Sequence, residues 1–256
     1  MHPKVRARCQ EVKQMSKTMA IPIPSTKTLV VFAPHPDDAE IFCGGTILKY
    51  LAIGFRAVII CVTSGNRGHL TIPPEELARI RESEARRSAV IADVELVWLG
   101  WEDTQVEANL DNRQQIIEAL RGIEPDLVLC PDLNDYHVDH REVGRLVTDA
   151  SYLLGVPQLK TDSEACPPPQ IYFYESHGGI GFSPEIWVDI SPFFTKKLTM
   201  LECHKSQIEW LKEHDGFDLL AYTEAKDRWH GFQSGCQYAE VFRPYRVFPV
   251  RCEELI

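Results

Sequence analysis

Short apolar runs rich in β-branched residues alternate with longer amphipathic segments through the first half of this chain. Because two successive parallel strands need a long crossover between them, usually a helix, this alternation is typical of βαβ units. The runs are apolar throughout rather than at every second residue, which indicates a sheet that is covered on both faces. The expected strands are residues 28–33, 56–63, 95–100 and 127–131, and the expected helices are residues 44–54, 75–92 and 113–124. The sequence therefore predicts an α/β fold, a Rossmann-like three-layer sandwich with a mostly parallel central sheet.

The second half of the chain adds further strands and a helix to this pattern. Residues 171–176 and 186–190 are expected strands, residues 193–212 an expected helix, and residues 238–248 a strand or a returning sheet edge. A length of 256 residues with 44% hydrophobic content suits one large core better than two. We expect one domain over residues 27–256. Before it, residues 1–26 are expected to form a poorly ordered extension, with a surface helix or a subunit contact as the alternative.

Charge and cysteine usage limit the possible partners and compartments. Lys and Arg total 27 against 37 Asp and Glu, so the formal net charge of −10 argues against binding to nucleic acid phosphates. The eight cysteines are scattered without a CxxC pair, and several lie in apolar runs where a thiol behaves as a small hydrophobe. No apolar run approaches the roughly 20 residues that span a bilayer, and the N-terminus has no signal-peptide core. We therefore expect a cytoplasmic protein with no membrane and no nucleic acid partner.

Polar clusters follow each of the four expected parallel strands. They are residues 35–38, 64–68, 101–103 and 134–140. The carboxyl ends of parallel strands meet at one edge of the sheet, and in open α/β sheets the ligand crevice lies beyond that edge. The sequence thus predicts a single site built from four loops.

Three residues of these clusters form a candidate zinc site. Catalytic zinc usually has three protein ligands drawn from His, Asp and Glu, and one open position for water. His35 and Asp38 lie three apart on one turn and can supply two ligands, and His140 in the last loop can supply the third. Either cluster alone could be a turn with a helix-capping residue, but both follow expected parallel strands. We therefore expect one Zn²⁺ per chain, bound by these three side chains.

The other polar residues of the two clusters suit proton transfer. Neighbouring side chains on an extended turn diverge, so Asp37 is free to act as general base toward a water molecule. His137 could polarise or protonate the other side of a tetrahedral intermediate. Asp139 lies between the two histidines in sequence and is expected to orient His137 and keep it cationic. We predict that Asp37, His137 and Asp139 are catalytic.

The two clusters also carry a family resemblance. His35-Pro36-Asp37-Asp38-Ala39-Glu40 with Cys43-Gly44-Gly45-Thr46, and His137-Val138-Asp139-His140, resemble the signature motifs of the PIG-L/LmbE family of zinc-dependent N-acetylglucosaminyl deacetylases. Weaker matches extend the resemblance over about residues 28–242. The resemblance implies the same zinc ligands, Asp37 as the base, and His137 as the residue that assists the oxyanion or the leaving amine. It also implies a Rossmann-like fold whose crevice holds a metal rather than a dinucleotide.

Two positions depart from the commonest family pattern. The first motif usually has Glu directly after the double Asp, whereas this chain has Ala39 and then Glu40, a spacing similar to that of the bacillithiol-pathway and diacetylchitobiose deacetylase branches. The second motif usually has Pro where Val138 stands. Neither departure affects an expected ligand. Some relatives use a Tyr slightly before the second motif, but Tyr136 lies one position too close to His137, so its role stays open.

Three further residues are candidate substrate contacts. Arg81 lies in a charge-rich helical segment, so a solvated helix face is the alternative, but the resemblance places it near the substrate, where a guanidinium suits hydroxyls or anions. Asp103 is by the same resemblance an acceptor for a sugar hydroxyl rather than an ordinary loop acid. His177 begins a glycine-rich run that could form a mobile pocket wall. The other glycine-containing loop, residues 64–68, could cradle a phosphate but lacks the motif of a P-loop or of a dinucleotide site.

The leading hypothesis is a zinc-dependent N-deacetylase of linear amide bonds, acting on an N-acetylglucosamine-containing small molecule or glycoside. One alternative keeps the zinc site and changes the substrate to a thiol conjugate or another small N-acyl compound. The other alternative is a noncatalytic nucleotide-binding Rossmann domain, which would bind no stoichiometric zinc. Relatives nearest in motif spacing often assemble as hexamers, so the resemblance also implies a homo-oligomer.

Overall fold

A computed structural model describes residues 26–247, so the expected extension at residues 1–26 lies outside the described part except for its last residue. The described chain contains a seven-stranded sheet with the order β3-β2-β1-β4-β5-β7-β6. The parallel strands are β1 (Thr28–Ala33), β2 (Arg56–Thr63), β3 (Glu95–Trp101), β4 (Leu127–Pro131) and β5 (Gln170–Tyr174). β7 (Ala239–Pro244) pairs antiparallel with β5 and with the edge strand β6 (Ile186–Asp189). The expected α/β fold with a mostly parallel sheet is confirmed.

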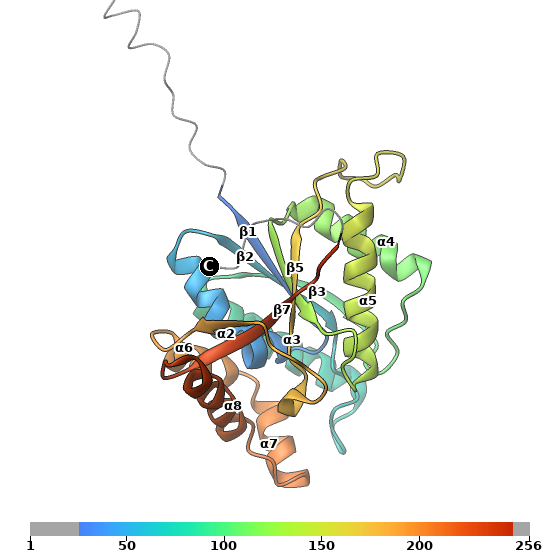
Figure 1. Cartoon of the computed structure of the whole chain (residues 1–256). Helices are drawn as coiled ribbons and strands as arrows, with labels where there is room; N and C mark the ends of the chain where they lie inside the picture. Colours follow the sequence, from blue (N-terminus) through green and yellow to red (C-terminus); the bar gives the residue numbers. More distant parts are fainter. Residues whose placement is uncertain (1–25, 248–256) are drawn as a thin grey trace, which may run out of the picture.

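Helices cover both faces of this sheet (Figure 1). In β1, Leu29 and Val31 belong to one hydrophobic core while Val30 and Phe32 belong to the other, because successive side chains of a strand point to opposite faces. The first core includes residues of α2 (Asp38–Ala52) and α6 (Phe194–Leu201), and the second includes residues of α4 (Leu110–Ile123) and α5 (Val138–Leu153). Burial on both faces accounts for the uninterrupted apolar runs in the sequence.

The helices differ from the sequence prediction in several respects. α2 begins at Asp38 rather than at residue 44, so the turn that carries His35 leads directly into a helix. The single helix expected over residues 193–212 is two helices, α6 and α7 (Lys205–His214), separated by a break at residues 202–204. Neither α5 nor α8 (Leu219–Ser234) was among the expected helices. The remaining elements are α3 (Pro74–Ala92) and the short 3₁₀ helix η1 (His177–Gly179).

The glycine pair in α2, Gly44 and Gly45, permits close packing beside the site. A Cβ atom on Gly45 would lie 2.5 Å from Ile190 Cβ, and one on Gly44 would lie 3.0 Å from Lys197 Cγ. Larger residues at these positions would push α2 away from α6 and from the segment that follows β6. The two glycines therefore allow α2, the helix that begins at Asp38, to pack closely against its neighbours.

The described residues contain neither a helix suited to cross a membrane nor a disulfide. None of the helices there combines the length and the apolar character that crossing a membrane requires. The cysteines in this part of the chain are all free thiols, namely Cys43, Cys61, Cys130, Cys166, Cys203 and Cys236.

Candidate metal centre

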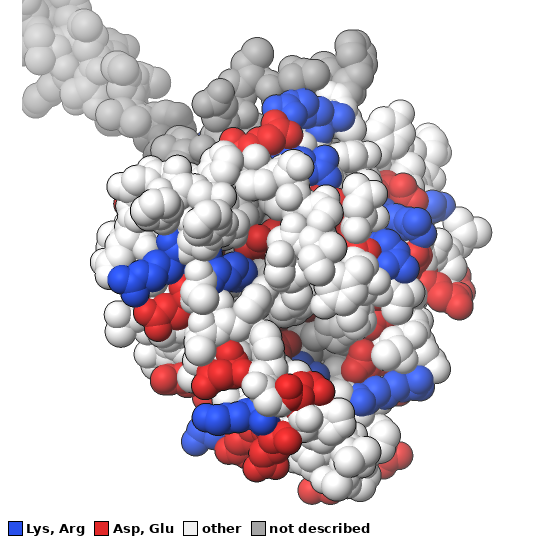
Figure 2. Space-filling view, turned by 60° about the horizontal axis from the view of Figure 1, so that its bottom comes forward, with Lys and Arg blue, Asp and Glu red and all other residues white. Residues whose placement is uncertain are grey.

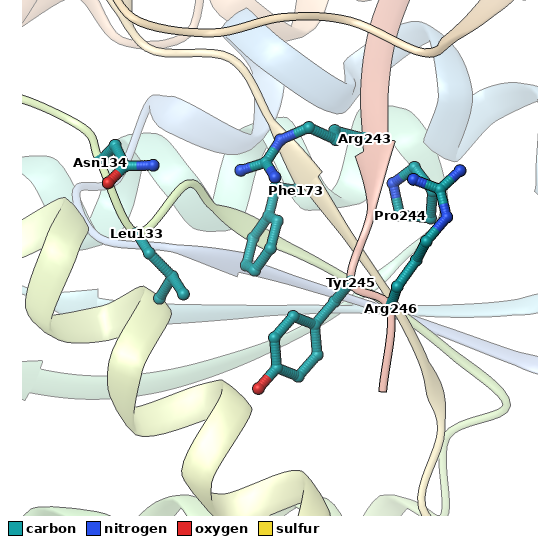
Figure 3. A pocket seen from close by; sticks show the side chains of 7 residues that line it. All are labelled: Leu133, Asn134, Phe173, Arg243, Pro244, Tyr245 and Arg246. Carbon is teal, nitrogen blue, oxygen red and sulfur yellow. The ribbon is translucent and has the colours of Figure 1, made fainter. Parts of the chain in front are cut away.

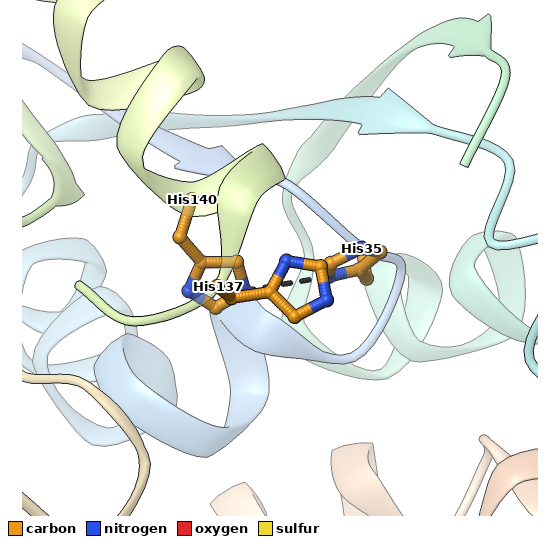
Figure 4. Close-up of side chains that lie close together, drawn as sticks. All are labelled: His35, His137 and His140. Carbon is orange, nitrogen blue, oxygen red and sulfur yellow. Dashed lines mark hydrogen bonds between the residues drawn. The ribbon is translucent and has the colours of Figure 1, made fainter. Parts of the chain in front are cut away.

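The loops after the parallel strands bring together three potential metal ligands. His35 Nδ1, Asp38 Oδ2 and His140 Nε2 form a triangle in which all three edges measure 3.3 Å. A tetrahedral zinc site with bonds of about 2.0–2.1 Å places neighbouring ligand atoms about 3.3–3.4 Å apart. The type and the spacing of the three donors therefore fit Zn²⁺. Figure 4 shows the His35 ring, from the turn after β1, meeting the His140 ring from the first turn of α5.

Carboxylates on the far side of each ring orient the two imidazoles. His140 Nδ1 lies 2.9 Å from Asp135 Oδ2, and His35 Nε2 lies 3.2 Å from both Asp103 Oδ1 and Asp139 Oδ2. When these outer nitrogens carry the protons, His35 Nδ1 and His140 Nε2 present their lone pairs to the centre of the triangle. Carboxylate–histidine pairs of this kind commonly fix the orientation of metal ligands.

The same carboxylates shift the pKa values of the ligand side chains. Burial lowers the pKa of His140, but Asp38 and Asp135 outweigh it and raise the pKa to about 9. Burial likewise lowers the pKa of His35, while hydrogen bonds with Asp103, Asp139 and Asp38 raise it well above its usual value. The pKa of Asp38 is raised by burial but lowered further by His140 and His35, so it lies well below the usual range. Protons therefore compete with a metal ion for the two imidazoles.

Two other groups of side chains bring candidate ligand atoms within 4.8 Å of one another. One contains His35, His137 and His140, and the other contains His35, Asp103 and Asp139. In the first group, His137 Nδ1 already accepts a hydrogen bond from the backbone N–H of Asp139 at 3.3 Å. In the second, both carboxylates face the outer nitrogen of His35. The equal-edged triangle that includes Asp38 therefore remains the best match to a catalytic zinc site.

Asp37 lies next to the triangle and is held by Arg81. The carboxylate of Asp37 is buried, and its Oδ1 accepts a hydrogen bond from Arg81 Nη2 at 3.0 Å. Arg81 is only 3% exposed, and its Nη1 donates to the carbonyl oxygen of Gly65 at 3.1 Å. The guanidinium expected at the substrate is thus directed at Asp37.

His137 is placed beside the ligands but in a different charge state from the one expected. Its ring lies 4.8 Å from that of His35 and 5.0 Å from that of His140, measured between centroids. Burial lowers the pKa of His137, and the positive charges of the two neighbouring imidazoles lower it further. Asp139 contacts His35 instead. Its negative charge raises the pKa of His137 only a little, so it does not keep that ring cationic. A neutral ring whose Nδ1 accepts a hydrogen bond carries its proton on Nε2, so His137 can donate from Nε2.

The remaining candidates take different positions around the site. Asp103 is buried, and although burial raises its pKa, the neighbouring His35 lowers it below the usual range. His177 lies near the ligands, with its ring centroid 6.3 Å from that of His140, and burial lowers its pKa so that it is neutral. Tyr136 is 56% exposed. The structure thus brings His177 to the site and pairs Asp103 with a ligand.

Sequence reasoning assigned no role to Asp135. It is buried, contacts His140 with one oxygen and accepts the backbone N–H of His137 with the other, at 2.9 Å in each case. The signal that could have found it is an acidic residue a few positions before an expected histidine ligand, because ligating histidines usually have a carboxylate behind them.

Charge on the face that Figure 2 shows is mixed, and a cavity lies beside β7, apart from the triangle of donors. On the face that Figure 2 shows, Lys and Arg side chains are interspersed with Asp and Glu. A cavity of about 350 Å³ beside β7 (Figure 3) is lined by Leu133, Asn134, Phe173, Arg243, Pro244, Tyr245 and Arg246. None of the predicted site residues lines that cavity, so the triangle of donors remains the candidate site.

The fold and the site together define an α/β protein with a candidate His/Asp metal site at the carboxyl ends of its parallel strands. The family model described as PIG-L, GlcNAc-PI de-N-acetylase, matches residues 30–151. A diacetylchitobiose deacetylase of Thermococcus kodakarensis is 32% identical over 234 residues, covering 87% of this chain and 84% of the relative. A probable N-acetyl-alpha-D-glucosaminyl L-malate deacetylase 2 of Bacillus anthracis is 30% identical over 189 residues, covering 70% and 80%. The chain belongs to the PIG-L family.

Solved structures share the whole architecture. The N,N'-diacetylchitobiose deacetylase of Pyrococcus horikoshii superimposes with a TM-score of 0.76 at 25% identity, covering 96% of this chain and 94% of that one. A 4-carboxy-2-hydroxymuconate hydratase of Pseudomonas putida gives a TM-score of 0.78 at 23% identity, with 90% and 100% covered, which shows a shared fold alone. Since the same fold occurs in enzymes of different names, the chemistry must be argued from the site.

Proposed function

We propose that this chain is a zinc-dependent N-deacetylase that hydrolyses the acetamide of an N-acetylglucosamine-containing small molecule or glycoside. Family membership and the deacetylases among its relatives support amide hydrolysis. The observation that carries the proposal is the triangle of donor atoms with 3.3 Å edges and a buried carboxylate, Asp37, beside it.

In this proposal the ion is held by His35, Asp38 and His140. When bound, zinc would lower the pKa of a water molecule and polarise the amide carbonyl. Asp135, Asp103 and Asp139 keep the two imidazoles oriented through their outer nitrogens. Asp135 and Asp139 act through the ligands, and Asp103 is also proposed to accept a hydrogen bond from a sugar hydroxyl of the substrate.

Two side chains of the site then transfer the proton and stabilise the developing negative charge. Asp37 accepts a proton from the attacking water and returns it to the amine nitrogen as the C–N bond breaks, so that acetate and a free amine result. His137 donates a hydrogen bond from Nε2 to the carbonyl oxygen as negative charge develops there. His177, neutral and close to His140, is proposed to contact the substrate.

The wider parts of the proposal concern assembly and location. We also propose that the protein forms a homo-oligomer and that it is cytoplasmic. Light scattering on the purified protein would measure the oligomeric state directly.

The proposal is tested by acetate release from a panel of amino sugars. The panel contains N-acetylglucosamine, diacetylchitobiose, N-acetylglucosaminyl malate and an inositol conjugate, and the metal content of the purified protein is measured alongside. We expect one zinc per chain and equal amounts of acetate and free amine from at least one compound. Zinc-loaded, folded protein that releases no acetate from the panel would contradict the amino-sugar substrate, and release from thiol conjugates would favour the alternative amidase.

A further inference from the structure

Helix α8 turns charged side chains inward and large aromatic side chains outward. Lys226, Asp227 and His230 are buried, whereas Trp229 is 58% exposed and Phe232 is 79% exposed. An ordinary surface helix has the opposite arrangement, with its apolar stripe toward the core. The helix lies at the outside of the fold (Figure 1), so its aromatic side chains face the solvent. An outward apolar face of this kind is typical of a surface that binds another protein.

The exposed rings of α8 lie beside a third aromatic ring on the edge strand β6. The rings of Trp229 and Phe232 stack with their centroids 6.2 Å apart. Trp187 of β6 is 38% exposed, and its Nε1 donates to Gln233 Oε1 of α8 at 3.3 Å. A single exposed ring such as that of Tyr152 is ordinary, but three large rings in one place indicate an interaction site. We call Trp187, Trp229 and Phe232 the aromatic patch.

The size of the aromatic patch fits a contact between two proteins. Full burial of a Trp or Phe side chain removes about 150–250 Å² from water, so the exposed parts of these three would together bury about 300–400 Å². A standard interface buries roughly 800 Å² on each partner. The aromatic patch thus supplies nearly half of that area before its smaller and polar neighbours are included.

The outward face of α8 is complementary to itself when two copies of the helix run antiparallel. Ala221, Ala225, Arg228 and Phe232 lie on one stripe, because a helix turns by about 100° per residue. In an antiparallel pair centred between positions 226 and 227, Phe232 of one copy faces Ala221 of the other, so a large ring meets a small side chain. Glu224 of one copy then lies beside Arg228 of the other. Both of these charged side chains are accessible to solvent.

We infer that the outward face of α8, together with Trp187 of β6, is a two-fold contact between two copies of this chain. Each pair of residues across such a contact occurs twice, so the match in size and the match in charge are both repeated. A different partner protein would not require the helix to be complementary to itself. The inference rests on the proposed homo-oligomer and adds the surface through which two copies meet.

The first test replaces the two most exposed rings by charged side chains. Analytical ultracentrifugation of the parent should show an oligomer with an even number of copies. The double variant Trp229→Glu, Phe232→Glu should raise the dissociation constant of this contact by about 30-fold or more, the scale of an interface hot spot. Tyr152→Glu, at a ring of α5 that is also 79% exposed, is the matched control and should sediment like the parent. A monomeric parent, or a double variant that sediments like the parent, would overturn the inference.

A charge exchange tests the antiparallel geometry and does not depend on the folding of the double variant. Glu224→Arg places two positive groups on each copy and Arg228→Glu places two negative groups, so either variant alone should associate more weakly than the parent. An equimolar mixture of the two should recover association, because opposite charges then face each other across the contact. A mixture that associates no better than either variant alone would overturn the inference. Acetate release by the parent tests the proposed catalysis separately, so failure of this contact and failure of the proposed function are distinguishable.

Discussion

Asp37 and Asp38 are neighbours in sequence, yet their carboxylates have different partners. Asp38 Oδ2 lies 3.3 Å from a nitrogen of each ligand histidine, whereas Asp37 Oδ1 lies 3.0 Å from Arg81 Nη2. One carboxylate can therefore bind the ion and the other can transfer a proton. The two roles are separable by mutation.

We expect Asp37→Asn to retain zinc and to lose turnover by about 10²–10⁴-fold, because the amide cannot accept the proton of the attacking water. Asp38→Ala should instead lose the ion, since one corner of the triangle is removed. Elemental analysis and acetate release measured on the same preparations separate the two effects. Loss of zinc from Asp37→Asn would show that the assignments are wrong.

Asp135 supplies a second prediction at the scale of single residues. Asp135→Ala removes the carboxylate that holds His140 Nδ1, so zinc affinity should fall by about 10–100-fold. Competition with a chelator of known affinity measures the change. Asp149→Ala, at an exposed acid of α5, the helix that carries His140, is the control and should bind zinc like the parent. Equal affinity in both variants would count against the proposed ligand.

At the scale of elements, a buried ionic network joins α2, α6, α8 and β7. Lys197 Nζ, with no exposed surface, donates to Asp227 Oδ2 at 2.5 Å, to Glu240 Oε1 at 2.7 Å and to the carbonyl oxygen of Ile41 at 3.0 Å. Glu240 in turn accepts the backbone N–H groups of Gly45 and Thr46 at 2.8 and 2.7 Å. The helix that begins at Asp38 is therefore anchored to the C-terminal half of the fold.

Removing the central cation of this network should destabilise the protein strongly. Lys197→Met leaves two buried carboxylates without their shared partner, which costs about 3–5 kcal/mol for a broken buried ion pair. Urea unfolding measures the free energy of unfolding. Lys196→Met, at the exposed neighbouring lysine, should change it little. Similar losses in both variants would mean that the network contributes no more than a surface charge.

Two element-level differences from the sequence prediction have a tertiary cause. The helix expected over residues 193–212 breaks because Glu84 of α3 accepts hydrogen bonds from Ser206 N and Oγ, at 2.9 and 2.6 Å, and so caps the start of α7. α8 escaped prediction because its buried face carries Lys226, Asp227 and His230 while Trp229 and Phe232 are exposed. Apolar periodicity cannot reveal a helix whose charged residues face inward.

At the scale of the whole molecule, two large hydrophobic cores lie on the faces of the sheet and the three proposed metal ligands lie at its end. None of the three ligands belongs to either core. We therefore expect chelation to abolish activity while the protein stays folded, as judged by circular dichroism and a cooperative unfolding transition. Unfolding on chelation would show that the ion is structural.

The stability of the chelated protein should depend on pH with a definite sign. The folded-state pKa of His140 is raised to about 9, above the usual 6.5 of an unfolded chain. The stabilisation from its protonated ring is therefore fully present below pH 6.5 and is lost as pH rises through about 9. Urea midpoints at pH 6 and pH 9.5 measure the difference, and His140→Gln should reduce it. A higher midpoint at pH 9.5 would contradict the assignment.

The class of fold, the first four strands and the loops that hold the site could be predicted from the amino-acid pattern alone. These features are local. The periods of strands and helices span a few residues of sequence, and so does the spacing of His35, Asp37 and Asp38. A contact between two distant loops could be expected only because parallel strands end at the same edge.

The pairing of charged groups, by contrast, follows from tertiary packing. Asp139 contacts His35, 104 residues away, rather than its sequence neighbour His137, and Arg81 reaches Asp37 across 44 residues. Such pairs depend on how helices and loops pack, and one buried partner removes the cost of burying the other. No local sequence pattern predicts which charged residues pair, because the energy of a buried charge depends on its surroundings in space.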